Sequence, residues 1–273
     1  MRRVHLTVGQ AVALGLVQGP TEVLPVSSSA HLILLPSLFR WRYRKLSAAE
    51  RKSFEVALHM GAAVALAAAR PREALPGLRP VSGRRLAGLL LSTAPPALAG
   101  VLLERAVEER LGGPDGVARA QVAAGLALAA ADRFPAQRRA REAAVADHLL
   151  IGLAQAAALA PGVSRTGAAL TVLRARRFRR ADAGRLSREA ALPVLLAAAA
   201  LKTLRLRRDR LPRSLAAPFA AGMAAAFAST LASSVLADRL DRARSYAPVA
   251  GYRVALGGLA LTRKPFATRL GKT

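Results

Sequence analysis

Long apolar runs alternate with short, strongly basic segments along most of this chain. A membrane-spanning helix needs about 20 apolar residues, fewer where the bilayer is thin. Six runs meet this description: Phe54–Ala69, Leu86–Leu103, Val117–Ala131, Ala190–Leu204, Leu215–Ala237 and Tyr246–Thr262. The pattern predicts an all-α, polytopic membrane protein with about six spans, in which residues 1–273 form a single integral membrane domain.

Two further apolar segments are each interrupted near the centre. The first consists of Val4–Val17 and Glu22–Leu38, with breaks at Gly19-Pro20 and Pro25, and the second of His148–Leu159 and Val163–Leu173, with a break at Pro161-Gly162. Interrupted backbone at membrane depth is tolerated where it lines a protein cavity. We therefore expect two re-entrant helix pairs, each entering the membrane and turning back.

The two interrupted segments resemble each other at a constant offset of 137 residues. Five positions are identical in both copies: Gly15, Leu16, Gln18, Val26 and Ser27 match Gly152, Leu153, Gln155, Val163 and Ser164. Three predicted spans, an odd number, separate the copies, so the second copy enters from the opposite face of the membrane. This predicts an inverted-topology repeat, with halves at about 1–131 and 132–273, that brings 18–31 and 155–167 into one cavity.

The composition excludes several classes of function. The formal net charge is +26, but arginine and lysine lie between the apolar runs and form no stripe on a soluble face, so nucleic acid is not an expected partner. The chain has no cysteine, which excludes disulfides, cysteine zinc sites and a thiol nucleophile. The basic residues of the alternate loops number 19 on each side, so the positive-inside rule does not orient the protein. The N-terminal apolar run has no small-residue cleavage site, and we expect it to be retained.

Polar and ionisable side chains are concentrated in the first interrupted segment, where such groups are costly and mark a site. They are Gln18, Glu22, Ser27, Ser28, Ser29 and His31. Glu22 and His31 can supply acid–base chemistry, and Ser28 a nucleophilic hydroxyl. His31 follows Ser28 by three residues, which places both on one helix face. Gln18 and Ser29 are secondary candidates, because Gln18 could equally satisfy a freed backbone group.

The second segment carries the run Pro161-Gly162-Val163-Ser164-Arg165-Thr166-Gly167 at the start of an apolar helix. Free N–H groups at a helix N-terminus attract anions, and glycine allows a ligand to approach the backbone. An arginine adds a bidentate fork suited to phosphate. We expect Arg165, Ser164, Thr166, Gly162 and Gly167, together with Ser27, to bind a pyrophosphate group.

These motifs resemble the signatures of the bacterial undecaprenyl-pyrophosphate phosphatase family, which is linked to bacitracin resistance. The resemblance rests on Gln18-x-x-x-Glu22, Pro25-Val26-Ser27-Ser28 with His31, and 161–167, and it extends over essentially the whole chain. It implies a multi-pass enzyme of the bacterial inner (plasma) membrane that hydrolyses undecaprenyl pyrophosphate and recycles the carrier lipid for peptidoglycan synthesis. Glu22, Ser28, His31 and Arg165 are the implied site residues.

The resemblance also implies dependence on a divalent cation, Mg²⁺ or Ca²⁺, for which Glu22 is the candidate ligand. The sequence departs from the family at Ala30, where glycine is usual, at Thr166, where serine is commoner, and at Arg188-Glu189, which replace an apolar pair and shorten the late span. Our hypothesis is that Ser28 attacks or holds the terminal phosphoryl group, His31 moves the proton and Glu22 acts through the metal.

Several alternatives stay open. Inverted repeats with broken helices are also a transporter architecture, so a transporter or flippase of polyprenyl phosphate lipid is the second candidate. A homodimer is compatible with the sequence. Glu55 and His59, one helical turn apart, are interpreted as structural or peripheral, and Asp132 and Asp147 as solvated loop residues.

Overall fold

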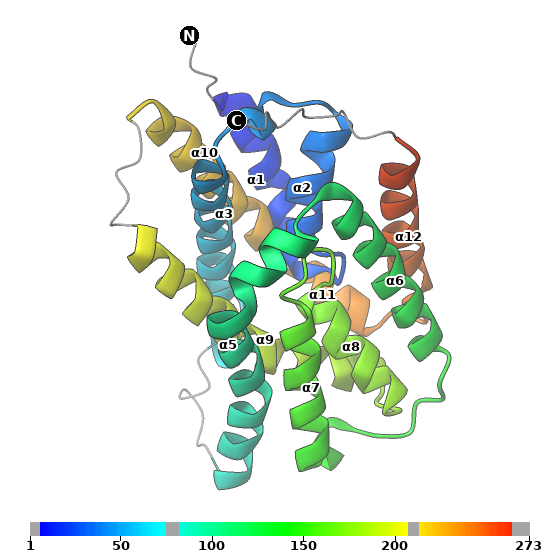
Figure 1. Cartoon of the computed structure of the whole chain (residues 1–273). Coiled ribbons are helices and arrows are strands. Elements are labelled where there is room, and N and C mark those ends of the chain that lie inside the picture. The colour runs from blue at the N-terminus through cyan, green and yellow to red at the C-terminus, as the bar shows by residue number, and fades with distance from the viewer. Residues whose placement is uncertain (1–5, 75–81, 207–212, 264–273) are drawn as a thin grey trace.

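A computed structural model of the chain describes residues 6–74, 82–206 and 213–263. The described residues form a bundle of helices without β-strands (Figure 1). In chain order the elements are α1 (Val8–Val23), α2 (Ser28–Leu38), η1 (Arg42–Lys45), α3 (Ala48–Ala69), α4 (Pro71–Ala74), α5 (Gly83–Leu111), α6 (Pro114–Asp132), η3 (Ala140–Glu142), α7 (Val145–Ala157), α8 (Arg165–Ala175), α9 (Arg180–Leu206), α10 (Arg213–Ser233), α11 (Val235–Asp241) and α12 (Ala247–Thr262). The predicted all-α class is confirmed.

Each of the six predicted apolar runs lies largely within a helix. Two segments of the described residues are long and apolar enough to cross a membrane by length and composition, Gly83–Leu103 in α5 and Ser214–Asp241 through α10 and α11. The count of six spans therefore stays a prediction. Val4, His5 and parts of the basic loops that entered the charge comparison lie outside the described residues.

Helix α9 begins at Arg180, well before the expected run at Ala190, because its charged first turns have partners. The Nε of Arg188 lies 2.9 Å from Glu73 Oε2, and its NH2 lies 2.7 Å from Asp241 Oδ2. The charged pair Arg188-Glu189 therefore belongs to the helix and does not delay its start.

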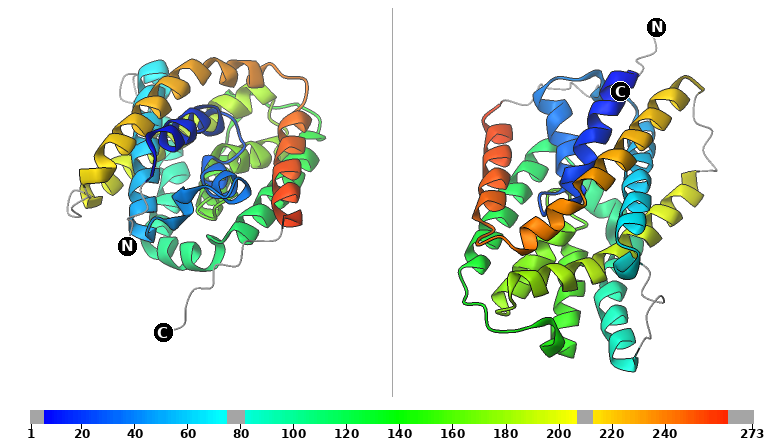
Figure 2. Two further views of the ribbon diagram at one scale, coloured as in Figure 1. Left: turned by 90° about the horizontal axis from the view of Figure 1, so that it is seen from above. Right: turned by 180° about the vertical axis from the view of Figure 1, so that it is seen from behind.

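The two interrupted segments form two helix pairs that enter the bundle from opposite ends (Figures 1 and 2). Helices α1 and α2 come from the end that carries the N-terminus and meet in a turn near the middle of the bundle, and α7 and α8 come from the other end. Helices α2 and α8 each have 11 residues. Each pair is held by a close crossing at equivalent glycines, because a Cβ at Gly15 would overlap the Gly222 carbonyl of α10 and a Cβ at Gly152 would overlap the Leu91 carbonyl of α5.

The predicted break at Gly19-Pro20 is wrong, since α1 continues through both residues to Val23. Pro20 has no N–H to bond the carbonyl of Leu16, four residues earlier. The hydroxyl of Ser229 donates to that carbonyl instead, over 2.6 Å. Gly19 lies directly against the α10 backbone, where a side chain would overlap Ser229. The chain therefore uses Gly19-Pro20 for a helix crossing, and the turn comes at 24–26, around Pro25.

The predicted break at Pro161-Gly162 is confirmed. Gly162 has a φ of +103°, which side chains rarely tolerate. A Cβ at Gly162 would lie 2.5 Å from the carbonyl oxygen of Val117 in α6. Glycine is therefore needed here for both the backbone conformation and the close packing of the turn.

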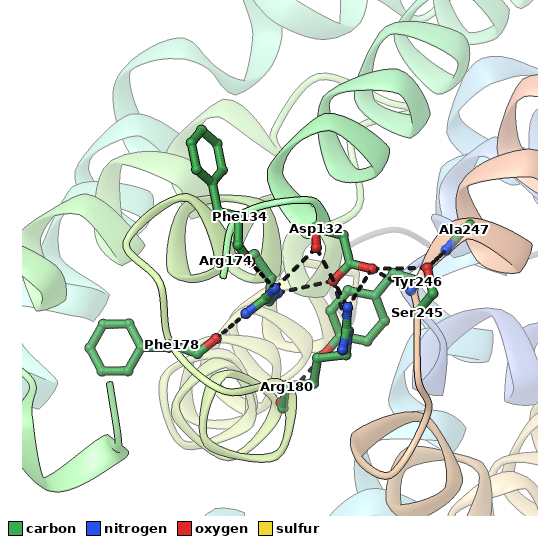
Figure 3. Close-up of polar contacts among 8 residues, drawn as sticks. All are labelled: Asp132, Phe134, Arg174, Phe178, Arg180, Ser245, Tyr246 and Ala247. Carbon is green, nitrogen blue, oxygen red and sulfur yellow. Dashed lines mark hydrogen bonds and ion pairs between the residues drawn. The ribbon is translucent and has the colours of Figure 1, made fainter. Parts of the chain in front are cut away.

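Asp132 and Asp147 are buried, so their interpretation as solvated loop residues is wrong. Asp132 ends α6 and accepts hydrogen bonds from Arg174 Nε (2.9 Å), Arg180 Nε (2.8 Å) and the backbone N–H of Tyr246 (2.8 Å), as Figure 3 shows. Arginines on α8 and α9 and the start of α12 thus converge on one carboxylate. This cluster fixes the outer end of the second helix pair.

Asp147 is the equivalent anchor at the start of α7. Its carboxylate lies 2.6 Å from Arg138 NH2 and 2.8 Å from Arg176 Nε. Burial by itself raises the pKa of Asp147, but the hydrogen bonds from Arg138, the Ala144 N–H and Arg176 lower that pKa to about 2. Asp147 therefore stays ionised and ties α7 to the end of α8.

Candidate active site

The carboxylate of Glu22 is the point at which the two helix pairs meet. Ser28 Oγ donates to Glu22 Oε2 over 2.6 Å, and Gln18 Nε2 donates to the same oxygen over 3.0 Å. From the other pair, Arg165 NH2 lies 2.9 Å from Glu22 Oε1. The Glu22 side chain is only 7% exposed. The predicted meeting of 18–31 and 155–167 is thus present as a direct contact between Glu22 and Arg165.

Two helix N-termini point into this meeting point, and serines cap both of them. Ser27 Oγ accepts from the Ala30 N–H at the start of α2, and Ser164 Oγ accepts from the Gly167 N–H at the start of α8. Ser27 also has a φ of +70° and exchanges a 3.1 Å hydrogen bond with Ser29. A non-glycine residue in this left-handed region is strained, as is common at functional sites. Ser27 and Ser164 therefore position the helix ends.

His31 faces α12 and, within the described chain, shares no hydrogen bond with Ser28. Its Nδ1 lies 2.8 Å from the carbonyl oxygen of Ser27 and so carries the proton, and its Nε2 accepts from the Tyr252 hydroxyl over 2.7 Å. The two rings are stacked, with centroids 5.6 Å apart. The helical spacing predicted that His31 and Ser28 lie on one face, but the His31 ring bonds the Ser27 carbonyl and Tyr252, whereas Ser28 bonds Glu22. The role of His31 as proton carrier stays a prediction without a contact in its favour.

The histidine beside Ser28 is His59, on α3. His59 Nδ1 lies 2.8 Å from the Glu55 carbonyl, and its Nε2 lies 3.4 Å from Ser28 Oγ and 3.6 Å from Glu22 Oε2. The interpretation of His59 as peripheral is therefore wrong. Glu55 does lie outside this contact and accepts from the Tyr43 hydroxyl over 3.1 Å. An ionisable side chain inside the first long apolar run was the available signal for His59.

Helices α6 and α12 contribute polar side chains that the sequence analysis did not select. Arg253 is fully buried and donates to the carbonyls of Pro25 and Gly162, each over 2.8 Å. Gln121 is fully buried and donates to the Val26 carbonyl over 2.7 Å. An arginine in the middle of the apolar run Tyr246–Thr262 was the signal that could have identified Arg253.

The two glycines of the second motif have packing partners within the protein. Gly162 lies against α6, and a Cβ at Gly167 would lie 2.5 Å from Arg253 NH1. Thr166 is half-buried next to Arg165. Substrate binding by Gly162, Gly167 and Thr166 stays a prediction. Both glycines are required because protein atoms approach them closely, the Val117 carbonyl at Gly162 and the Arg253 guanidinium at Gly167.

The site combines more positive than negative charge. Arg165 donates to the Glu22 carboxylate, Arg253 donates to a backbone carbonyl in each turn, and two helix N-termini begin at the site. Arg165 and His59 are 24% and 25% exposed, so both are accessible from outside the bundle. A hydroxyl hydrogen-bonded to a carboxylate, beside a guanidinium, is an arrangement that binds an anionic group and supplies a nucleophile to it.

The described side chains of the site do not form a ready-made set of ligands for a metal ion. No group of three or more His, Cys, Asp or Glu side chains with metal-binding geometry occurs among the described residues. The oxygens of Glu22 already accept from Ser28, Gln18 and a guanidinium, which a cation would have to displace. Metal binding by Glu22 therefore stays a prediction, and we assign no chemical step to such an ion.

Fold and site define a helical membrane protein whose polar centre lies where two interrupted helix pairs meet. Residues 11–259 match the family model of bacitracin resistance protein BacA, and the chain belongs to this family. It is similar to the undecaprenyl-diphosphatase of Geobacter sulfurreducens, with 38% identity over 92% of this chain and 96% of the relative. The undecaprenyl-diphosphatases of Pelotomaculum thermopropionicum and Moorella thermoacetica are 37% and 38% identical, over 92% and 93% of this chain and 95% and 97% of theirs.

Proposed function

We propose that this protein hydrolyses undecaprenyl pyrophosphate to undecaprenyl phosphate and inorganic phosphate, recycles the carrier lipid for peptidoglycan synthesis and so confers bacitracin resistance. The family membership supports the substrate. The observation that carries the chemistry is the chain of contacts from Arg165 through Glu22 to Ser28, at 2.9 and 2.6 Å. A binding protein needs the anion anchor alone, whereas hydrolysis also needs the hydroxyl and its proton acceptor.

In the proposed reaction, Arg165 and the two helix N-termini hold the terminal phosphate. Glu22 accepts the proton of Ser28 as the Ser28 oxygen bonds to the terminal phosphorus, and the phosphoanhydride bond breaks to release the lipid monophosphate. Water then hydrolyses the phosphoserine. The sequence predicted His31 as the group that moves the proton. We propose Glu22 as the proton acceptor instead, because Ser28 already donates to Glu22. His31 keeps Tyr252 and the backbone of Ser27 in place.

The membrane arrangement is part of the proposal. We infer six spans and two re-entrant pairs in an inverted repeat within the bacterial inner membrane. The equal lengths of α2 and α8, and the crossings at Gly15 and Gly152, support the repeat. We propose that the divalent cation, Mg²⁺ or Ca²⁺, arrives bound to the substrate's pyrophosphate, because no group of three His, Cys, Asp or Glu side chains among the described residues could hold it without the substrate.

Phosphate release by the purified chain in detergent micelles tests this function, because transport cannot be scored without a sealed membrane. With undecaprenyl pyrophosphate we expect release by the unaltered chain and at least about a hundredfold less by Glu22→Gln and Ser28→Ala. Glu109→Gln is the matched control, since Glu109 is exposed and pairs with Arg105. No release by the unaltered, folded chain would overturn the hydrolase and favour a transporter or flippase of polyprenyl phosphate.

A further inference from the structure

Arg253 is a buried cation whose guanidinium contacts backbone carbonyls in both turns of the site. NH1 donates to Pro25, two residues before the cap of α2, and NH2 donates to Gly162, two residues before the cap of α8. Its side chain is fully buried, and within the described part of the chain its Nε has no hydrogen-bond partner. One side chain thus spans the two turns that carry the candidate chemistry.

The charge of Arg253 lacks the compensation found at other buried arginines of the bundle. Among the described residues no carboxylate pairs with Arg253, whereas the equally buried Arg174 has Asp132 at 2.9 Å. A buried charge without a counter-ion is costly, which makes a purely structural role a poor explanation. An anionic ligand at the adjacent site would supply the missing negative charge.

The surrounding chain makes room for this guanidinium. Gly167 lies in the first turn of α8, and a Cβ there would lie 2.5 Å from Arg253 NH1. Any side chain at Gly167 would therefore displace Arg253 from its carbonyl partners. The position of Arg253 therefore depends on the absence of a side chain at Gly167, even though 86 positions separate the two residues in the sequence.

We propose that Arg253 is a positioning residue of the hydrolase. It holds the Pro25 and Gly162 carbonyls at a fixed spacing, so that Ser28 at the start of α2 and Arg165 at the start of α8 face one pyrophosphate group. Its uncompensated charge adds to the positive potential behind both helix ends. The proposal rests on the proposed function and acts through Ser28 and Arg165, without direct contact with the substrate.

Steady-state kinetics of the full chain in detergent test the proposal. Arg253→Gln removes the charge and the fork, and we expect kcat to fall at least about thirtyfold with KM changed less than about threefold, because displaced reacting groups raise the barrier. Arg253→Lys keeps the positive charge and can still donate hydrogen bonds from its single ammonium nitrogen, so it should recover part of that loss. Gly167→Ala should lower kcat like Arg253→Gln, and Gly258→Ala, with no atom within 4 Å of its added Cβ, is the matched control on α12.

The double variant Gly167→Ala/Arg253→Gln gives the decisive comparison. If both changes break one unit, the double variant is no slower than the slower single variant. The positioning role would be overturned if the fold-losses in kcat of the two single variants multiply in the double variant. It would also be overturned if the variants lower the Tm but keep wild-type kcat in the folded protein. If the unaltered chain releases no phosphate, the proposed function is overturned. If Ser28→Ala loses activity but Arg253→Gln and Gly167→Ala keep native kcat, only the role of Arg253 is removed.

Discussion

The molecule contains two polar clusters that are built from the same kinds of side chain but differ in completeness. Around Asp132, Arg174 also donates to the carbonyls of Phe134 and Phe178, and the Ser245 hydroxyl and the Tyr246 N–H donate to the carboxylate (Figure 3). Around Glu22, Arg165 donates to the carboxylate and is 24% exposed, and the buried Arg253 donates to the backbone carbonyls of Pro25 and Gly162. A closed cluster, whose guanidinium groups donate to several protein acceptors, holds helices together, whereas an open cluster with an accessible guanidinium can take up an anion.

The position of each cluster fits this division. The Asp132 cluster joins α6, α8, α9 and α12 at an end of the bundle, where the second helix pair enters. The Glu22 cluster lies at the turns of both pairs, near the middle. The Asp132 cluster holds these helices together at one end of the bundle. This helps to keep the positively charged groups near Glu22 close to one another in spite of their mutual repulsion.

The largest expected effect comes from breaking the closed cluster. Asp132→Asn leaves Arg174 and Arg180 without their counter-ion, and losing one partner of a buried charged cluster typically costs about 3–5 kcal/mol. Thermal unfolding in detergent measures the loss, and phosphate release per folded molecule should stay native. Asp115→Asn, at the other end of the same helix α6 and exposed, should cost less than about 1 kcal/mol. Equal Tm values for the two variants would contradict a structural role for Asp132.

A smaller effect is expected from pH at the second closed cluster. The pKa of Asp147 lies at about 2, below its ordinary value of 3.8, because the hydrogen bonds from Arg138 and Arg176 outweigh burial. The lowered pKa contributes stability that is fully present above about pH 4 and is lost as the pH falls through about 2. Its size is up to about 2 kcal/mol, reduced by screening at the half-exposed Arg176.

The Tm of the unaltered chain and of Asp147→Asn, measured between pH 7 and pH 2, checks this contribution. At pH 7 the unaltered chain should have a higher Tm than Asp147→Asn. The difference in Tm between the two proteins should shrink toward pH 2 as Asp147 becomes protonated. A difference that stays constant across this range would show that the ionisation of Asp147 does not stabilise the fold.

The sequence predicted the parts of the site that depend on local pattern. Apolar runs and the Pro-Gly break located the helices and the second turn, and the repeat predicted that Glu22 and Arg165 would meet. Contacts between distant segments could not be read in this way. Ser229 lies 213 positions from Leu16, whose carbonyl it satisfies, and that bond makes Gly19-Pro20 a crossing and not a break.

The same limit explains the roles of the histidines and acids. Local spacing placed His31 near Ser28, but its partner Tyr252 lies 221 positions away, and His59 reaches Ser28 from α3. Asp132 and Asp147 looked solvated because their neighbours are charged, yet arginines at 174 and 176 enclose them. Burial of an acid depends on the three-dimensional position of its cations, which hydropathy does not encode.

The smallest expected effect concerns the shape of the open cluster, with its charge preserved. Arg165 NH2 donates to Glu22 Oε1, and within the described chain no other group accepts from this guanidinium, so its remaining N–H groups are available to a ligand. Arg165→Lys keeps the positive charge but cannot hold Glu22 and a phosphate oxygen with one planar fork. Phosphate release should therefore fall about tenfold, equivalent to about 1.4 kcal/mol of transition-state stabilisation. Arg105→Lys, at a site 92% exposed, should leave the rate unchanged. Near-native turnover by Arg165→Lys would show that the open cluster acts through net charge alone and would remove bidentate anchoring from the mechanism.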